Sequence, residues 1–110
     1  MDIEFATWKL AKACNSEKAM KAEWGVRMAK KLKRRLSDLE AANTLEEVRS
    51  LPGRCHELLA DRKGQLAMDL VHPLRLIFRP SHDIRPAKPD GGLDWQQVTS
   101  IEILGICDYH

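Results

Sequence analysis

The spacing of hydrophobic residues changes at Pro52-Gly53, near the middle of the 110-residue chain. Before this pair, hydrophobic residues recur every three or four positions, which is typical of amphipathic helices. After it, they alternate with other residues, which is typical of strands with one buried face. This order predicts an α+β fold for residues 1–110 as a single domain, with a helical layer packed on a small, mainly antiparallel twisted sheet.

The strongest helical pattern runs from residue 17 to about residue 42. Asn15-Ser16 is a favourable N-cap, and Gly25 is the one weak helix former, costing about 1 kcal/mol relative to alanine. We expect one long helix here and a short helix over 45–51, the two forming a hairpin over the sheet. The apolar stripe of the long helix consists of Met20, Trp24, Met28, Leu32, Leu36 and Leu39.

Two alternating runs, 66–70 and 74–78, favour an antiparallel hairpin. Both apolar sets can face the core only if a three-residue loop, Val71-His72-Pro73, joins the strands. Further strands are expected at about 54–59 and from Val98 onward. On this register the residues on the opposite face of the hairpin include Asp69, Arg75, Ile77 and Arg79.

The remaining segments are less regular. Residues 3–6 form an extended piece that could join the sheet, and the chain from there to residue 13 is ambiguous between strand and loop. Residues 80–97 predict a long irregular connection, in which Trp95 is expected to anchor the loop to the core. A loop of this length in a compact domain is often functional.

Composition favours a soluble globular domain, with 44% hydrophobic and 31% charged residues. No apolar run has membrane-spanning length, and the first residues lack the pattern of a secretory signal. Three separated cysteines, Cys14, Cys55 and Cys107, form no CxxC pair and indicate reduced thiols, so we expect a cytoplasmic protein. A zinc site using Cys55-His56 is disfavoured because adjacent ligands lack the usual spacing.

Positive charge is concentrated between residues 17 and 38. This segment has eight Lys or Arg residues and three acidic residues, a net charge of +5, so the rest of the chain carries −3 of the total +2. The segment suggests an anionic partner, with RNA as the first candidate, although a solvated helix face is the alternative. The residues that share one helix face are Arg27, Lys30, Lys31 and Arg34.

The final residues place three ionisable groups after an apolar, β-branched strand over 101–107. By strand alternation Asp108 and His110 share one face and Tyr109 lies on the other. Cleavage of RNA by its own 2′-hydroxyl requires proton transfer and phosphate neutralisation, but no metal and no cofactor, so we expect neither. A strand that merely becomes polar at the surface is the alternative.

Four segments, in order, resemble the RelE/ParE toxin superfamily, and most closely its HigB-type plasmid maintenance killer branch. They are residues 51–58, 61–65, 74–78 and 108–110. The resemblance implies a RelE-like fold and a toxin of a type II toxin–antitoxin pair that cleaves mRNA in the ribosomal A site as a metal-independent endoribonuclease. Its implied partners are a helix-turn-helix, HigA-like antitoxin, the ribosome and mRNA, with operator DNA bound only through the antitoxin and no membrane.

The resemblance also implies roles for individual residues. Arg75 matches a phosphate-binding arginine of the active site. The C-terminal trio Asp108, Tyr109 and His110 matches catalytic residues, with His110 as the proton-transfer group. The expected RNA- or phosphate-binding residues are Arg62, Lys63, Arg79, Arg27, Lys30, Lys31 and Arg34.

One position departs from the HigB pattern. Leu59 stands where a lysine is often found, and Lys63 is the candidate substitute for the lost charge. The alternative function is inhibition by binding alone, as in superfamily relatives that inhibit a topoisomerase or in a toxin that has lost nuclease activity. The Asp-Tyr-His ending favours the enzyme, because a pure binder does not need His110 as a proton carrier.

Overall fold

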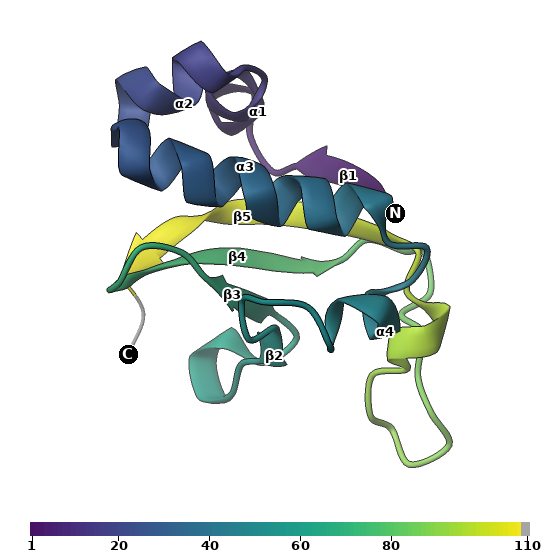
Figure 1. The fold of residues 1–110 in the computed structure, drawn as a ribbon. Coiled ribbons are helices and arrows are strands. Elements are labelled where there is room, and N and C mark those ends of the chain that lie inside the picture. Colours follow the sequence, from purple (N-terminus) through teal and green to yellow (C-terminus); the bar gives the residue numbers. More distant parts are fainter. Residues whose placement is uncertain (109–110) are drawn as a thin grey trace.

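The protein folds into one open sheet with helices packed mainly on one side, in a computed structural model that describes residues 1–108 (Figure 1). Within these residues the sheet has five strands in the order β1-β5-β4-β3-β2. β1 pairs with β5 in parallel, and the other neighbours are antiparallel. The strands are β1 Asp2–Phe5, β2 His56–Glu57, β3 Leu66–Asp69, β4 Leu74–Pro80 and β5 Ser100–Asp108.

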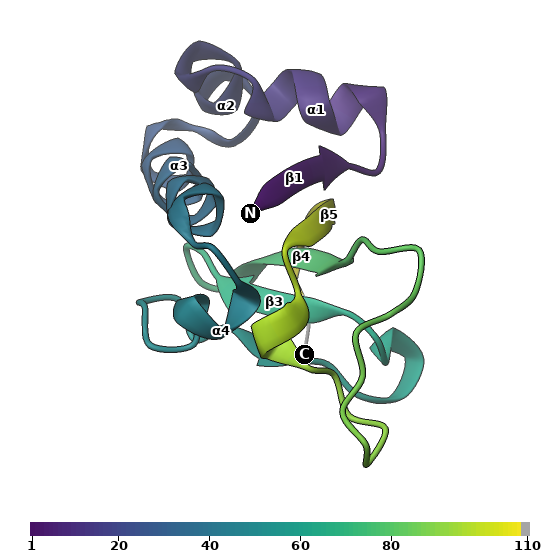
Figure 2. The same cartoon turned by 90° about the vertical axis from the view of Figure 1, so that its right-hand side faces the viewer.

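The longest helix, α3, lies across β4 and β5, and α1 and α2 lie outside it (Figures 1 and 2). Two short 3₁₀ helices, η1 and η2, lie in the connections before β3 and before β5. The mixed α+β class and the mainly antiparallel sheet expected from the sequence are confirmed. The helices are α1 Trp8–Cys14, α2 Glu17–Trp24, α3 Val26–Ala41 and α4 Leu45–Val48, with η1 Ala60–Arg62 and η2 Trp95–Gln97.

The prediction of one unbroken helix over residues 17–42 is wrong. Gly25 has φ 87° and ψ 165°, which ends α2 and starts α3 in a new direction. Glycine accepts this backbone conformation without the steric penalty of a side chain. The segment left ambiguous between strand and loop also contains a helix, α1, whose N-cap Thr7 accepts a hydrogen bond from Leu10 N–H at 3.1 Å.

Three other predicted elements are shorter in the structure. The second helix stops at Val48 and is held by a capping box, in which the Thr44 and Glu47 side chains each bond the other's backbone. The strand expected over 54–59 is reduced to β2, and the last strand begins at Ser100 rather than Val98. The helical layer, which the sequence predicted as two helices, therefore consists of several shorter helices.

The central hairpin has the predicted register and a three-residue loop. Leu66 lies opposite Phe78, and Asp69 lies opposite Arg75. The Leu70 N–H donates to the Leu74 carbonyl at 3.0 Å and closes the loop. This register commits alternate residues to opposite faces, so Arg75 and Asp69 share a face away from α3.

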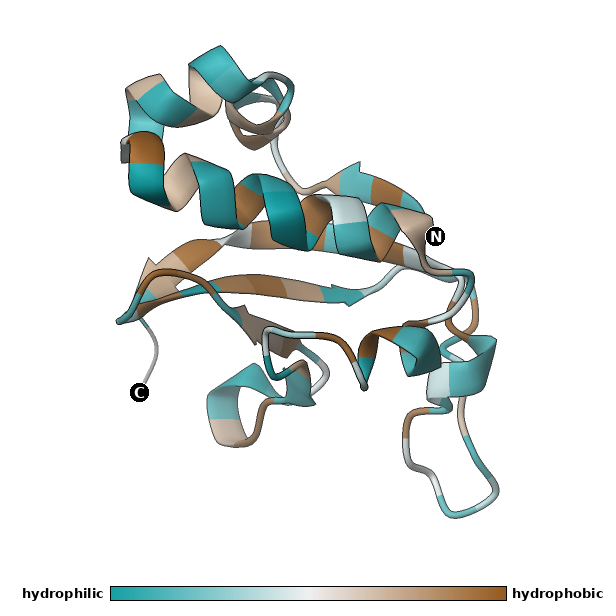
Figure 3. Ribbon diagram, in the orientation of Figure 1, coloured by the Kyte–Doolittle hydropathy of each residue, from teal (hydrophilic) through white to brown (hydrophobic). Residues whose placement is uncertain are grey.

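The main core lies between α3 and the sheet, where Leu32, Leu39, Leu76 and Phe78 are fully buried. Figure 3 shows the hydrophobic residues concentrated along β3, β4 and β5. A second, smaller cluster on the other face contains Leu58, Ala67 and Ile77, with Leu104 and Cys107 packed against it.

Trp95 anchors the long loop to the core, as expected. Its ring is buried, its Nε1–H donates to Glu57 Oε2 at 3.0 Å, and the Arg49 guanidinium lies 3.9 Å from the ring centre. The indole thus joins the 80–97 connection to both the helical layer and β2.

The cysteines are free thiols. Burial raises the pKa of Cys14 to about 11 and that of Cys55 to about 12, so both thiols are protonated at neutral pH. Among residues 1–108, no group of three or more His, Cys, Asp or Glu side chains is arranged to hold a metal ion. Within the same residues, none of the helices has both the length and the hydrophobicity needed to span a membrane.

Candidate functional site

Arg75, the arginine expected to bind phosphate, is the second residue of β4 and lies close to the hairpin loop. It is paired with Asp69 on β3 and with Cys107 on β5. Its Nε–H donates to Asp69 Oδ1 at 3.0 Å, and 19% of its side chain is exposed. Arg75 therefore lies near the beginning of an inner strand, next to the β3–β4 loop.

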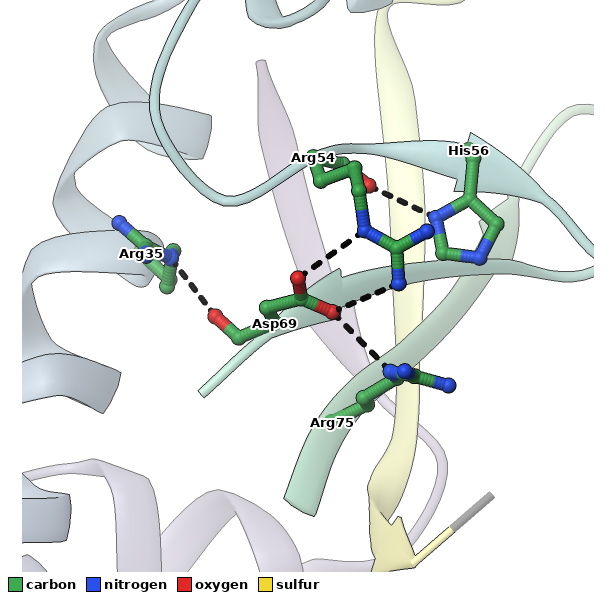
Figure 4. A network of polar contacts seen from close by, with 5 residues as sticks. All are labelled: Arg35, Arg54, His56, Asp69 and Arg75. Atoms are coloured by element: carbon green, nitrogen blue, oxygen red, sulfur yellow. Dashed lines mark hydrogen bonds and ion pairs between the residues drawn. The ribbon is translucent and has the colours of Figure 1, made fainter. Parts of the chain in front are cut away.

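Asp69 is the centre of a cluster of arginines (Figure 4). Arg54 donates from Nε to Oδ2 at 3.1 Å and from Nη2 to Oδ1 at 3.3 Å, so Oδ1 is shared with Arg75. A third arginine, Arg35 of α3, donates from Nε to the Asp69 backbone carbonyl at 2.9 Å. We refer to Arg54, Asp69 and Arg75 as the arginine cluster.

The arginine cluster sets the charge of the Asp69 carboxyl. Burial raises its pKa, but the hydrogen bonds and positive charges of Arg54 and Arg75 outweigh burial and hold the pKa below its ordinary value of 3.8. Asp69 is therefore ionised at neutral pH, and two guanidinium groups surround one carboxylate. The cluster keeps a net positive charge, which suits an anionic ligand.

The Pro52-Gly53 turn brings Arg54 to this place. The Asp69 N–H donates to the Gly53 carbonyl at 2.7 Å, which ties the turn to the end of β3. Arg54 follows with φ 51°, a left-handed conformation that directs its side chain toward Asp69. Non-glycine residues adopt this conformation infrequently, and functional sites are where such strain is concentrated.

His56 lies beside the arginine cluster. Its Nδ1 is 2.7 Å from the Arg54 carbonyl oxygen, and because a carbonyl only accepts, Nδ1–H must be the donor. In the neutral ring this leaves Nε2 as the proton acceptor. The sequence interpretation treated His56 as structural or surface; its half-buried position next to Arg54 makes it a candidate for proton transfer.

Asp108 ends β5 next to the start of β4. The register pairs Cys107 with Arg75 and Asp108 with Leu74, so strand alternation places Asp108 on the opposite face from Arg75. Tyr109 and His110, the other two members of the predicted catalytic trio, lie outside the described residues. The described chain brings the end of β5 to the edge of the arginine cluster.

The basic face of α3 lines a groove of about 580 Å³, whose opposite wall is the β3–β4 loop with Leu70, Val71 and His72. Arg35, only 6% exposed, also lines the groove and links it to the arginine cluster through the Asp69 carbonyl. The predicted RNA-binding residues in this groove are Arg27, Lys30, Lys31 and Arg34, of which Arg34 also pairs with Asp38 at 3.4 Å.

The other predicted basic residues lie apart from this groove. Arg62, in η1, donates from Nη1 to Gln65 Oε1 at 3.3 Å, and Lys63 follows it in an exposed position. Arg79 is near the far end of β4, where its guanidinium is 2.7 Å from Glu102 Oε1. Arg79 is therefore separated from Arg75 by several residues of strand. Leu59, at the position where the family pattern often has a lysine, is 75% exposed.

Sequence reasoning missed Arg54 and Asp69 as a pair. Strand alternation already placed Asp69 on the face of Arg75, so that contact could have been foreseen. Arg54 could not, because its approach depends on the turn at Gly53 and on the tertiary hydrogen bond to β3.

No protein-family model and no curated protein matches the sequence. The solved structures that match include a YoeB/ParE toxin from Agrobacterium tumefaciens, with 12% identity, a TM-score of 0.61 and full coverage of both chains. They also include the YoeB dimer (17% identity, TM-score 0.56) and the YoeB–YefM complex (17%, 0.57) from Staphylococcus aureus, each covering 100% of this chain and 97% of that chain.

At these identities the likeness shows the fold alone: the chain has the fold of YoeB/ParE-type toxins. This agrees with the fold that the resemblance of the sequence segments implies. The HigB-type branch is not distinguished by these structures.

Proposed function

We propose that this protein is the toxin of a type II toxin–antitoxin pair, of the HigB-type branch, and that it cleaves mRNA on the ribosome. The observation that carries the proposal is the arginine cluster at the end of β5, on the fold of YoeB/ParE-type toxins. The positive charges of two guanidinium groups at one place complement the negative charge of an RNA phosphate. The toxin part of the proposal is supported by the fold, which is that of YoeB/ParE-type toxins.

The proposed reaction is attack of a ribose 2′-hydroxyl on the neighbouring phosphate, with departure of the 5′ oxygen. Arg75 stabilises the negative charge that develops on the phosphate. His110 is the proposed acid, and Asp108 and Tyr109 are proposed to support proton transfer. His56 offers a second proton-transfer group through Nε2.

The basic groove of α3 is proposed to contact ribosomal RNA. Its cations lie on a face separate from the apolar stripe, and the groove joins the arginine cluster through Arg35. Arg62 and Lys63 are proposed to contact RNA from η1. Counterion release would make such binding strongly salt-dependent.

The proposed partner is a cognate antitoxin, which a helix-turn-helix protein of the HigA type would fit. One solved structure with the same fold is the YoeB–YefM complex from Staphylococcus aureus. Operator DNA would be bound only through the antitoxin.

The test is a cell-free translation reaction with a defined mRNA, in which new 5′ ends are mapped by primer extension with and without ribosomes. Wild type is compared with Arg75→Ala and His110→Ala, and Arg85→Ala serves as a control because Arg85 lies in the exposed loop before η2. We expect ribosome-dependent cuts that fall at least a hundredfold in the two site variants and persist in the control. Wild type that makes no cuts under any condition would refute the nuclease.

One observation favours a second function, inhibition by binding alone. Leu59, where the family pattern often has a lysine, presents an exposed apolar side chain beside η1 rather than a cation. If the protein arrests bacterial growth but leaves mRNA intact in the test above, this second function is the correct one.

A further inference from the structure

Within residues 1–108, the hydrogen bonds of the Arg54 side chain come from one edge of its guanidinium. Its Nε and Nη2 both donate to Asp69, which occupies one edge of the planar guanidinium. The side chain is nonetheless 60% exposed, and a guanidinium has five N–H donors, so most of its donors remain available at the surface. The two bonds to Asp69 thus orient a guanidinium whose side chain stays largely exposed.

Stability alone does not account for this arrangement. Exposed ion pairs contribute little to folding, because solvent screens them and ordering two long side chains costs entropy. Asp69 also holds two arginines at once, through the shared oxygen Oδ1. Because Arg54 Nη2 and Arg75 Nε reach the same atom, Oδ1, the two guanidinium groups lie side by side on the sheet face.

We propose that Arg54 binds a phosphate of single-stranded RNA adjacent to the phosphate held by Arg75, and that Asp69 is a positioning residue that fixes both guanidinium groups. The inference rests on the proposed function only for the identity of the RNA as substrate. Arginine suits this task because its planar fork gives two parallel hydrogen bonds to phosphate oxygens.

The geometry explains why both arginines need the carboxylate. Without Asp69, two cations side by side would repel each other and each would sample many rotamers. With Asp69 ionised, its negative charge offsets the repulsion, and both guanidinium groups are held in place before RNA binds. Leu59, close by in sequence, supplies no charge, so Arg54 is the cation that this segment offers to the sheet face.

The test measures binding separately from cleavage. A fluorescent single-stranded RNA with 2′-O-methyl groups throughout lacks the nucleophile, so its affinity for the full chain can be followed by anisotropy across a salt series. We compare wild type with Arg54→Gln, with Arg54→Lys, and with Arg85→Gln, which removes an equal charge from an exposed loop.

We expect Arg54→Gln to weaken RNA binding about tenfold and to make the slope of log affinity against log salt less negative by about 0.7, the change for one lost phosphate contact on a single strand. Arg54→Lys should retain the salt slope because the positive charge remains. It should recover only part of the affinity because an ammonium group cannot make the two parallel hydrogen bonds of a guanidinium. Arg85→Gln should change neither. If Arg54→Gln matches Arg85→Gln in affinity and slope, the phosphate contact is refuted.

The role of Asp69 is tested by repeating the Arg54→Gln measurement in an Asp69→Asn background. If Asp69 positions Arg54, the tenfold loss should shrink to about threefold or less, because the arginine is already poorly placed. An undiminished loss would overturn the positioning role. These outcomes do not depend on whether wild type cleaves mRNA, so the inference and the nuclease proposal fail independently.

Discussion

Replacing Gly53 with alanine tests how tightly the turn, α3 and the arginine cluster are joined. Gly53 has φ +113°, and a Cβ placed there would meet Arg35 Nε at 2.7 Å, Met68 Cε at 3.0 Å and Arg35 Cδ at 3.1 Å. Arg35 would have to move, and its 2.9 Å hydrogen bond to the Asp69 carbonyl would be lost. The substitution therefore combines backbone strain with the loss of a buried contact.

Gly64 provides a matched control. It has a similar φ of +93°, but no atom lies within 4 Å of a Cβ built there. Gly64→Ala should cost about 1 kcal/mol, since backbone strain of about 1–2 kcal/mol is partly offset by the lower entropy of the unfolded chain. Gly53→Ala adds the loss of the hydrogen bond of a charged donor, about 1.5–3 kcal/mol, for a total of about 2.5–4 kcal/mol.

The assay is urea unfolding followed by circular dichroism, with the free energy of unfolding extrapolated to water. A difference of about 1.5–3 kcal/mol between the two variants should appear as a lower midpoint for Gly53→Ala with little change in slope. Equal destabilisation of the two variants would mean that Arg35 yields without cost, and that the link between α3 and Asp69 is weak.

Three shorter predictions concern individual side chains. Arg54 and Arg75 depress the pKa of Asp69. Asp69 therefore contributes stability that is present above its ordinary pKa of 3.8 and is lost as pH falls through the lower pKa of the folded state. Urea midpoints between about pH 2 and pH 5 should accordingly fall less steeply in Asp69→Asn than in wild type. Cys14 and Cys55, with pKa values of about 11 and 12, should resist iodoacetamide at neutral pH and react only after unfolding. Mass spectrometry reads the labelling, and labelling of either thiol in the native protein would contradict its burial. Trp95→Phe should lose about 1 kcal/mol of stability in urea because the hydrogen bond to Glu57 is removed while most packing remains, and an unchanged midpoint would show that this bond contributes nothing.

The hairpin was the part of the fold that sequence reasoning specified best. Alternation over 66–70 and 74–78 determines the faces of both strands, and the three-residue loop then fixes the register that the structure has. This works because a shift of one residue would expose the whole apolar set.

The helical half was specified less well, for a physical reason. The apolar stripe passes through Gly25 without interruption, so periodicity alone favours one helix. The break depends on the backbone conformation of Gly25, which glycine permits but does not require. The packing of α2 beside α3 decides whether the chain adopts this conformation or continues as one helix. Likewise, α1 is too short for its periodicity to distinguish helix from loop.

The candidate site could be predicted only in part. Arg75 was identified through a family resemblance, and Asp69 follows from strand alternation. Arg54 reaches the site through a left-handed turn residue and a hydrogen bond between distant segments, neither of which leaves a periodic signal. Asp108 lies at the expected end of β5, while the roles of Tyr109 and His110 remain predictions.

The parallel pairing of β1 with β5 has a consequence for how the protein acquires its structure during synthesis. Ile3 is hydrogen-bonded in register with Ile101, so nearly the whole chain separates two neighbouring strands. β5 is also the strand against which β4 pairs, and the apolar face of α3 needs both. The nascent chain thus carries β1 without its partner strand, and separated from the β2–β3–β4 part of the sheet, until residues 100–108 have been translated. Long-range closure of this kind is slow relative to local folding. A protein proposed to act on translating ribosomes would therefore complete the central strand beside its arginine cluster only after its own translation has reached residues 100–108.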